Sequence, residues 1–358
     1  MKDTKLQELV EKLKPQIDRK LETFFAEKIA SASNINSDYK HLLATSARVS
    51  LRGGKRLRPM LAILGYQISE GTDTEKIINA SVSLEIFHNY LLIHDDIMDR
   101  DDFRHGGLNV SGVYTKRLSK LMPENEAKHH AMSFAINAGD VLSGLCYESL
   151  IASGFEPSRI LQAISLLSST TFTVASGQQL DIIASFNKNL SLKKLISIAK
   201  LKTADYSIVM PLQFGAILAG TGAEKLDAME KYGNSVGIAF QLTDDVLGMF
   251  GEKKTTGKPD ISDLREGKQT VLMHYGMKFA SSEEKKILKG AFGNQNANLK
   301  DLKNVRAILE NSGAKAKVIL MAQEYVDSAK SHIPTITNNQ EHIEILHEFA
   351  EYCANRKK

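Results

Sequence analysis

The sequence predicts an all-α fold, and three observations carry that prediction. Apolar residues recur at the spacing of a helix face, as near the N-terminus, where that face is formed by Leu6, Leu9, Val10, Leu13 and Ile17. Long segments contain neither Gly nor Pro, the residues that most often interrupt a helix. Convincing strands are missing, since short β-branched stretches such as residues 170–174 lie inside longer sequence that is compatible with a helix.

Further along the chain, local signals mark where individual helices begin and end. Residues 72–75 have the spacing of a capping box and open a segment without Gly or Pro that reaches Asp99. The same spacing returns at residues 281–284, and another long helix is expected over residues 223–250. The most apolar run, residues 208–220, is too short for a membrane span and is expected to form a buried core helix.

Two segments interrupt the helical pattern and are expected to be long loops. Residues 100–125 carry charges, paired glycines and Pro123, and residues 248–267 carry several Lys and Asp residues, Gly257 and Pro259. Long loops inside a compact domain are often lids or binding loops. The prediction is one all-α domain over residues 1–358, with each loop placed just after an acidic motif.

Composition bounds the class of protein. The 358 residues carry 46 Lys and Arg against 42 Asp and Glu, with 42% hydrophobic and 25% charged residues, which excludes intrinsic disorder. The near-balanced charge argues against nucleic acid as the main partner. Only two cysteines are present, so a reducing compartment is expected. No targeting segment and no membrane span are recognised, and we expect a soluble, cytoplasmic protein.

The first chemical motif is His-Asp-Asp-Ile-Met-Asp, at residues 94–99. Asp95 and Asp99 are four residues apart and share a helix face, with Asp96 beside them. Acidic groups at the C-terminal end of a helix oppose its dipole, so the cluster is unfavourable without a cation. Carboxylate oxygens suit Mg²⁺, which commonly shares its ligands with substrate phosphates. The alternative is a solvated acidic helix end.

A second acidic pair, Asp244 and Asp245, lies near the end of the helix expected over residues 223–250. Two separate acidic clusters, each followed by a basic loop, suggest two carboxylate walls that face each other across metal ions and a polyphosphate.

A third motif, Gly-Gly-Lys-Arg-Leu-Arg-Pro at residues 53–59, combines flexible backbone with cations. Paired glycines let a loop approach an anion closely, and Lys55, Arg56 and Arg58 supply phosphate-binding charge. A basic surface turn or a nucleic-acid patch is the other interpretation. Scattered cations and a Lys-Thr pair gain meaning only in combination with the aspartates: Arg104, Lys202-Thr203, Lys258 and Lys268.

Taken together, the motifs GGKRLRP, FHNYLLIHDDIMD, GQQLD, KT, FQLTDDVLGMFG and GKPDISDLREGK resemble those of the trans-isoprenyl diphosphate synthases, the polyprenyl synthetase family. They run in the family's order between about residue 53 and residue 268. The resemblance implies an isoprenoid synthase-type helical bundle around a deep central cavity, usually as a homodimer. It also implies a transferase that condenses isopentenyl diphosphate with an allylic diphosphate and uses about three Mg²⁺ ions.

The resemblance further implies a role for each matching residue. The metal ligands would be Asp95, Asp96, Asp99, Asp244 and Asp245. Lys202, Thr203 and Gln241 would be catalytic and would bind the allylic diphosphate together with Arg104, Lys258 and Lys268. Isopentenyl diphosphate would be bound by Lys55, Arg58, His88 and His105. His88 lies seven residues before Asp95, on the same helix face.

Product length is expected to depend on Tyr90, with Leu91 next to it. Tyr90 lies five residues before Asp95, so a bulky ring there would limit the growing chain about 7.5 Å deeper along the helix. The combination resembles geranylgeranyl synthases most, with a farnesyl product as second choice. The other interpretation of Tyr90 is an ordinary core tyrosine.

The sequence departs from the family pattern at a few positions. His105 stands where the family commonly has Arg, Asn109-Val110 where it has Pro-Thr, and Gly248 where the second motif often ends in Asp. These departures leave a catalytically weak partner subunit as an alternative. A class I terpene cyclase is a second alternative, disfavoured by the motif at residues 53–59.

Overall fold

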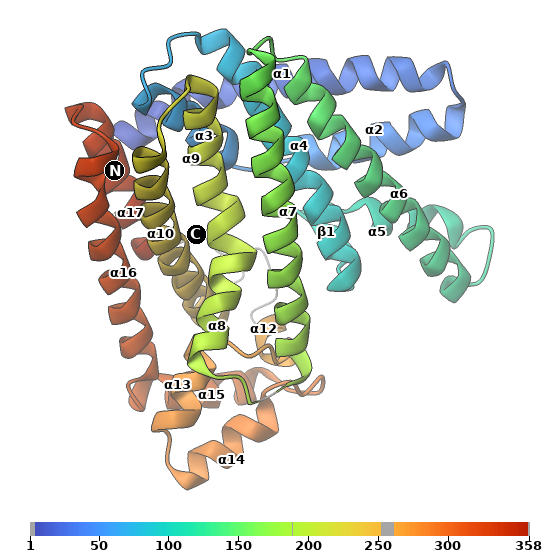
Figure 1. Cartoon of the computed structure of the whole chain (residues 1–358). Coiled ribbons are helices and arrows are strands. Elements are labelled where there is room, and N and C mark those ends of the chain that lie inside the picture. The colour runs from blue at the N-terminus through green and yellow to red at the C-terminus, as the bar shows by residue number, and fades with distance from the viewer. Residues whose placement is uncertain (1–3, 188, 252–260, 357–358) are drawn as a thin grey trace. The chain divides into compact units, whose positions relative to one another are not determined.

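The computed structural model describes residues 4–187, 189–251 and 261–356 (Figure 1). It confirms the all-α prediction. The first half of the chain forms α1 (Lys5–Ser33), α2 (Ser37–Leu51), α3 (Leu57–Ile68), α4 (Thr74–Met98), α5 (Val110–Leu118), α6 (Glu124–Ile151) and α7 (Pro157–Phe186). The second half forms α8 (Leu192–Ile198), η1 (Ala199–Val209), α9 (Met210–Ala219), α10 (Ala223–Phe250), α12 (Ser262–Glu266), α13 (Val271–Phe279), α14 (Ser282–Ala291), α15 (Leu299–Asn311), α16 (Ala314–Ile336) and α17 (Gln340–Asn355).

The chain folds as two compact units. Unit 1 contains mainly residues 7–164 and 214–220, and unit 2 mainly residues 165–213 and 221–358. The first acidic motif and the motif at residues 53–59 belong to unit 1. The Lys-Thr pair and the second acidic motif belong to unit 2.

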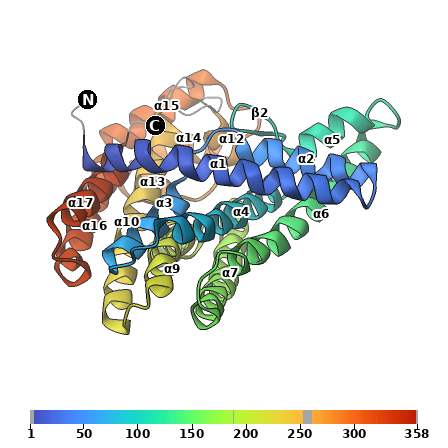
Figure 2. The ribbon, with the colours of Figure 1, turned by 90° about the horizontal axis from the view of Figure 1, so that it is seen from above.

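Helix α4 is the central element of unit 1, because it is buried along most of its length and around most of its surface. It packs against α3 and α6, and α1 and α2 form an antiparallel helical hairpin nearby (Figure 2). Asp73 caps α4 by accepting a hydrogen bond from the Lys76 amide, so the cap lies one residue later than the Thr72 of the expected capping box. The helix then runs without interruption to the first acidic motif.

Helix α10 has the same role in unit 2. It spans Ala223–Phe250, as the sequence predicts, and packs against η1, α16 and α17. The buried Tyr232 hydroxyl of α10 donates a hydrogen bond of 2.7 Å to the Leu346 carbonyl of α17. The capping box at residues 281–284 is confirmed at the start of α14.

The prediction of a long loop over residues 100–125 is wrong. This segment contains helix α5 and a two-stranded hairpin, in which β1 (Phe103–Arg104) pairs antiparallel with β2 (Gly107–Leu108). Asn109 caps α5, because its side-chain Oδ1 accepts a hydrogen bond of 2.8 Å from the Gly112 backbone amide. Its side-chain Nδ2 donates a hydrogen bond of 2.6 Å to the Asp101 carbonyl. The departure at Asn109 therefore has a local structural reason.

Candidate active site

In unit 1, the first acidic motif forms the C-terminal end of α4. Asp95 is half-buried and Asp99 is exposed, and the Asp99 amide donates a hydrogen bond of 2.8 Å to the Asp95 carbonyl. The two residues are thus one helical turn apart, as the spacing predicts.

Asp96 is in a different environment from its two neighbours. It is buried, and both Nε and Nη2 of Arg104 donate to its Oδ1, the Nε bond at 2.9 Å. Burial raises the pKa of Asp96 to about 6, against the lowering effect of the Arg104 guanidinium. The carboxylate expected to assist with metal and the guanidinium expected to bind diphosphate are therefore paired with each other. The pair ties the hairpin to the end of α4.

The hairpin also lies against the glycine-containing loop at residues 53–54. A Cβ added to Gly53 would lie 3.6 Å from the Cβ of His105, which occupies a left-handed turn position with φ 51°. Arg52 donates hydrogen bonds of 3.3 and 2.8 Å to the carbonyls of Arg104 and Leu108. The first basic motif and the turn that carries His105 are thus brought together.

Arg56 is a structural residue. It is buried, with 4% of its surface exposed, and its guanidinium donates to Asp18 at 2.6 Å and to Glu85 at 2.7 Å. It also donates to the carbonyls of Ser50 and Leu51. Arg56 therefore holds the loop in place, and its charge is already balanced by two carboxylates.

The other predicted isopentenyl diphosphate residues lie around the same loop. Burial and the nearby Arg58, Arg104 and His105 hold the pKa of His88 well below its usual range. Partial burial and nearby Arg104, Arg56 and Arg52 also lower the pKa of His105. Lys55 is exposed and Arg58 half-buried. Arginine side chains lie around both histidines and suit an anion, although Arg56 and Arg104 are already paired with carboxylates.

Tyr90 is a buried residue of α4, with 8% of its surface exposed. Its ring meets Phe87 and His94 edge to face, at centroid distances of 5.2 and 5.9 Å. The neighbouring Leu91 is half-buried. Tyr90 is therefore fixed between aromatic rings one turn before the acidic motif, whatever its role in product length.

In unit 2, Asp181 is the centre of a charged cluster. It is buried, with 5% of its surface exposed, and its Oδ2 accepts hydrogen bonds from Lys202 Nζ at 2.5 Å and Lys268 Nζ at 2.6 Å. Burial alone would raise the pKa of Asp181, but the two ammonium groups hold that pKa below its usual value. Two predicted diphosphate-binding lysines, 66 positions apart in sequence, are thereby fixed side by side.

Lys202 and Thr203 lie on η1, a π-helical segment. π-Helical segments are rare in proteins, and those that occur often lie at functional sites. Neighbouring glycines allow close packing around it: a Cβ at Gly177 of α7 would lie 2.5 Å from the Lys202 amide nitrogen, and one at Gly237 of α10 would lie 2.4 Å from the Ala204 Cα. The glycine of the Gly-Gln-Gln-Leu-Asp motif therefore lets α7 approach the backbone of Lys202.

Two of the three residues predicted to be catalytic, Thr203 and Gln241, belong to one hydrogen-bond chain. The Thr203 hydroxyl donates to Gln241 Oε1 at 2.8 Å, and Gln241 Nε2 donates to Asp245 Oδ1 at 2.9 Å. Burial, together with the neighbouring Asp244 carboxylate, raises the pKa of Asp245 to about 7. This chain fixes the amide of Gln241 and connects η1 to the second acidic motif.

Asp244 is exposed and is paired with Arg356, just beyond the end of α17. The Arg356 guanidinium lies 3.7 Å from the centre of the Phe240 ring, which gives it a second contact with α10. In the unbound protein, the Arg356 guanidinium therefore pairs with Asp244, a carboxylate that is predicted to bind metal.

The donor set of both acidic motifs fits Mg²⁺. Asp95, Asp99 and Asp244 offer hard oxygen ligands at partly or fully exposed positions. Within residues 4–187, 189–251 and 261–356, no three acidic, His or Cys side chains form a ready metal cage. Mg²⁺ commonly keeps several waters and uses one or two carboxylates plus substrate phosphates, so such a cage is not required. Lys258 lies outside the described residues, and so does Glu252, which follows Gly248.

Sequence reasoning gave no role to Asp181, Arg52 or Arg356. Asp181 is the last residue of the Gly-Gln-Gln-Leu-Asp motif. Its position in that motif is the one sequence signal that could have pointed to a role for it. Arg52 and Arg356 act through tertiary contacts with residues 52 and 112 positions away, which no local pattern reveals.

Comparison with known proteins identifies the family of this chain. A family model described as polyprenyl synthetase matches residues 40–309. The chain is 32% identical over 324 residues to a geranylfarnesyl diphosphate synthase of Aeropyrum pernix, covering 88% of this chain and 95% of that protein. It is 30% identical to a geranylgeranyl diphosphate synthase of Saccharolobus solfataricus, covering 90% of this chain and 93% of that one.

A solved structure gives the same result for the fold. The geranylgeranyl pyrophosphate synthase from Corynebacterium glutamicum, complexed with isoprenyl diphosphate and magnesium, superimposes with a TM-score of 0.90 at 29% identity, covering 97% of this chain and 99% of that one. The predicted isoprenoid synthase-type helical fold is thus confirmed. Since the family model also spans most of the sequence, the chain belongs to the polyprenyl synthetase family.

Proposed function

We propose that this trans-prenyltransferase adds isopentenyl diphosphate to an allylic diphosphate and releases all-trans geranylgeranyl diphosphate. The observation that carries the proposal is the cluster in which Asp181 fixes Lys202 and Lys268, beside the chain Thr203–Gln241–Asp245. Relatives named for geranylgeranyl and geranylfarnesyl diphosphate support a short-chain product. We propose that the whole chain acts as a single polyprenyl synthetase domain.

In this proposal, the basic residues of the first motifs bind and orient the diphosphates. Isopentenyl diphosphate is bound by Lys55, Arg58, His88 and His105. Arg104 binds the allylic diphosphate and keeps its hydrogen bond to Asp96. Asp95 and Asp99 hold Mg²⁺, as Asp244 does in unit 2. When bound, Mg²⁺ supplies positive charge that stabilises the leaving diphosphate, and the number of ions expected is about three.

Lys202 and Lys268 stabilise negative charge on the leaving diphosphate. The ammonium groups of Lys202 and Lys268 are held in place before substrate binds, so little reorganisation is needed as charge grows on the departing oxygen. The Thr203 hydroxyl and the Gln241 amide carry oxygen dipoles suited to the allylic cation. The double bond of isopentenyl diphosphate then attacks that cation. The released diphosphate takes up the proton lost from the adjacent carbon, and the new double bond completes the product.

Substitution of the acidic motifs tests this function. Asp95→Ala and Asp244→Ala should each lower turnover by orders of magnitude, since losing a charge-stabilising group costs about 3 kcal/mol or more in the transition state. Asp227→Ala, which removes an exposed acid of α10 from its pair with Lys231, is the matched control and should keep full activity. Turnover is measured with isopentenyl and farnesyl diphosphates, and the fold by circular dichroism. Near wild-type turnover in either motif variant would contradict the assignment.

We also propose that the enzyme is a homodimer that uses the exposed face of α7. Within the described residues, α7 is the one helix long and apolar enough to cross a membrane, yet only 33% of its most apolar window is buried. Phe172, Ile182 and Phe186 are 81%, 43% and 69% exposed. A second copy would cover this face. The cytoplasmic location stays a prediction.

The dimer is tested by light scattering coupled to size exclusion. Phe172→Glu should shift the protein from about twice the chain mass to the chain mass. Leu320→Glu, at a 54% exposed apolar residue of α16, is the control and should leave the mass unchanged. A wild-type protein that elutes as a monomer would contradict the proposal.

A further inference from the structure

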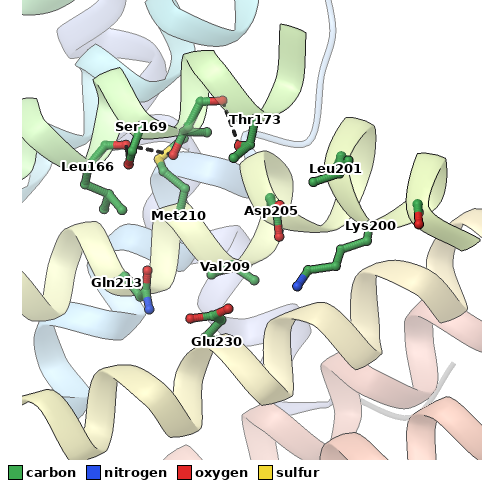
Figure 3. A pocket seen from close by; sticks show the side chains of 12 residues that line it. Leu166, Ser169, Thr173, Lys200, Leu201, Asp205, Val209, Met210, Gln213 and Glu230 are labelled. Atoms are coloured by element: carbon green, nitrogen blue, oxygen red, sulfur yellow. Dashed lines mark hydrogen bonds between the residues drawn. The ribbon is translucent and has the colours of Figure 1, made fainter. Parts of the chain in front are cut away.

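Unit 2 contains a solvent-open pocket of about 370 Å³ between α7, η1 and α10 (Figure 3). Its size is within the range of small-molecule sites. Leu166, Leu201, Val209 and Met210 supply its apolar surface. The pocket lies on η1 but on other residues than Lys202 and Thr203, so it is separate from the charged cluster around Asp181.

In this structure the hydroxyl groups of the lining donate within their own helices and present their oxygens as acceptors to a ligand. Ser169 and Thr170 donate their protons to the Leu166 carbonyl, and Thr173 donates to the Thr170 carbonyl (Figure 3). Ser197 in the same way donates to the carbonyl of Lys193. Each hydroxyl proton is thus used within its own helix, and only oxygen lone pairs remain.

The amide and the charged groups of the lining also offer more hydrogen-bond acceptors than donors. Gln213 Nε2 donates one of its two N–H groups to the Leu226 carbonyl at 2.9 Å, and its Oε1 remains an acceptor. Lys200 and the carboxylates of Asp205 and Glu230 point toward the same opening (Figure 3). In the part of the chain that the structure describes, none of these three side chains makes a hydrogen bond or ion pair. The pocket therefore carries two carboxylates against one ammonium.

Electrostatics adds support from the same residues. Burial, together with the Glu230 carboxylate, raises the pKa of Asp205 to about 6, against the effect of Lys200. A cation in the pocket would relieve this unfavourable placement of an ionised carboxylate. An anion such as a diphosphate would meet Lys200 as its main donor and would be repelled by both acids.

We propose that this pocket binds a small alkylammonium compound, with its ammonium groups on the acceptor-rich lining and its methylenes on the apolar side chains. The two carboxylates accept from the ammonium groups, and the hydroxyl and amide oxygens complete their hydrogen bonds. Since four lining residues belong to η1, namely Lys200, Leu201, Asp205 and Val209, bound ligand would stabilise the segment that carries Lys202 and Thr203. This binding site does not depend on the proposed prenyl transfer.

Calorimetric titration with hexamethylenediamine tests the site, and hexanediol of the same length is the uncharged control. Wild-type protein should bind the diamine and not the diol. The double variant Asp205→Asn with Glu230→Gln should bind at least about tenfold more weakly, because it loses two charged acceptors. Lys200→Gln should bind several-fold more tightly, since it removes a like charge. Asp227→Asn, an exposed acid of the same helix α10, should behave as wild type.

Amide hydrogen exchange locates the bound diamine. Protection should rise in residues 199–209 on addition of hexamethylenediamine and should not rise in the double variant. Circular dichroism confirms that each variant is folded. Equal diamine binding in wild type and the double variant, equal binding of diol and diamine, or protection confined to other segments would each overturn the proposal.

Discussion

Replacing Asp181 with Asn should destabilise the protein far more than replacing an ordinary surface aspartate. Asp181 is 5% exposed, and its Oδ2 is the shared acceptor for Lys202 and Lys268. The substitution leaves two ammonium groups close together without their counter-charge. Removing one partner of a buried ion pair typically costs about 3–5 kcal/mol. Because both lysines are partly exposed to solvent, we expect the lower end, about 3 kcal/mol.

The assay is urea unfolding followed by circular dichroism, with Asp227→Asn as the matched control. Asp227 pairs with Lys231 on the surface of α10, where both side chains are more than half exposed. Such surface pairs contribute about 0–1 kcal/mol, so the control should unfold near the wild-type midpoint.

Acidification gives a second, independent readout. The folded-state pKa of Asp181 is lowered, so its contribution to stability is present above the unfolded pKa and is lost as pH falls through the folded value. The difference between wild type and Asp181→Asn should therefore be full near neutral pH and shrink below about pH 4. If Asp181→Asn unfolds with the control at neutral pH, the cluster does not stabilise unit 2 as described.

Three further predictions concern substrate, product and metal. Tyr90→Ala should lengthen the product by one or more five-carbon units, measured by chromatography of the hydrolysed products, and an unchanged distribution would remove Tyr90 as the limit. His105 has a lowered pKa in the unbound protein, and a bound diphosphate would raise it, so binding takes up a proton and the KM for isopentenyl diphosphate should rise between about pH 6 and 8. His105→Arg should flatten that rise, and a profile that stays unchanged would place His105 outside the site. Arg356→Gln should tighten Mg²⁺ binding about two- to fivefold in calorimetry, since it releases the exposed Asp244 from its ion pair, and an unchanged affinity would show that the pair does not compete with metal.

The sequence predicted the long helices well because their signals are local. The bounds of α10 follow from a segment whose apolar residues keep helical spacing, and the start of α14 follows from Ser281 and Glu284. The glycines and charges after Asp99 predict a loop, and that prediction is wrong. A short helix capped by Asn109 and a two-residue hairpin leave little trace in hydrophobic periodicity.

The sequence indicates which residues belong to the candidate site better than it indicates which of them contact one another. Lys202 and Lys268 were identified as cations, but their shared partner Asp181 lies 21 and 87 positions away. Arg56 looked like a phosphate ligand, yet it is bound by Asp18 and Glu85 from two other helices. Such pairings depend on tertiary packing, which sequence spacing along one helix does not contain.

The proposed prenyl transfer can be measured by incubating the purified protein with Mg²⁺, isopentenyl diphosphate and farnesyl diphosphate and separating the products by chain length. We expect turnover that stops when the metal is chelated, with all-trans geranylgeranyl diphosphate as the main product. No condensation product from the folded protein, with farnesyl or with geranyl diphosphate as the primer, would contradict the proposed transfer.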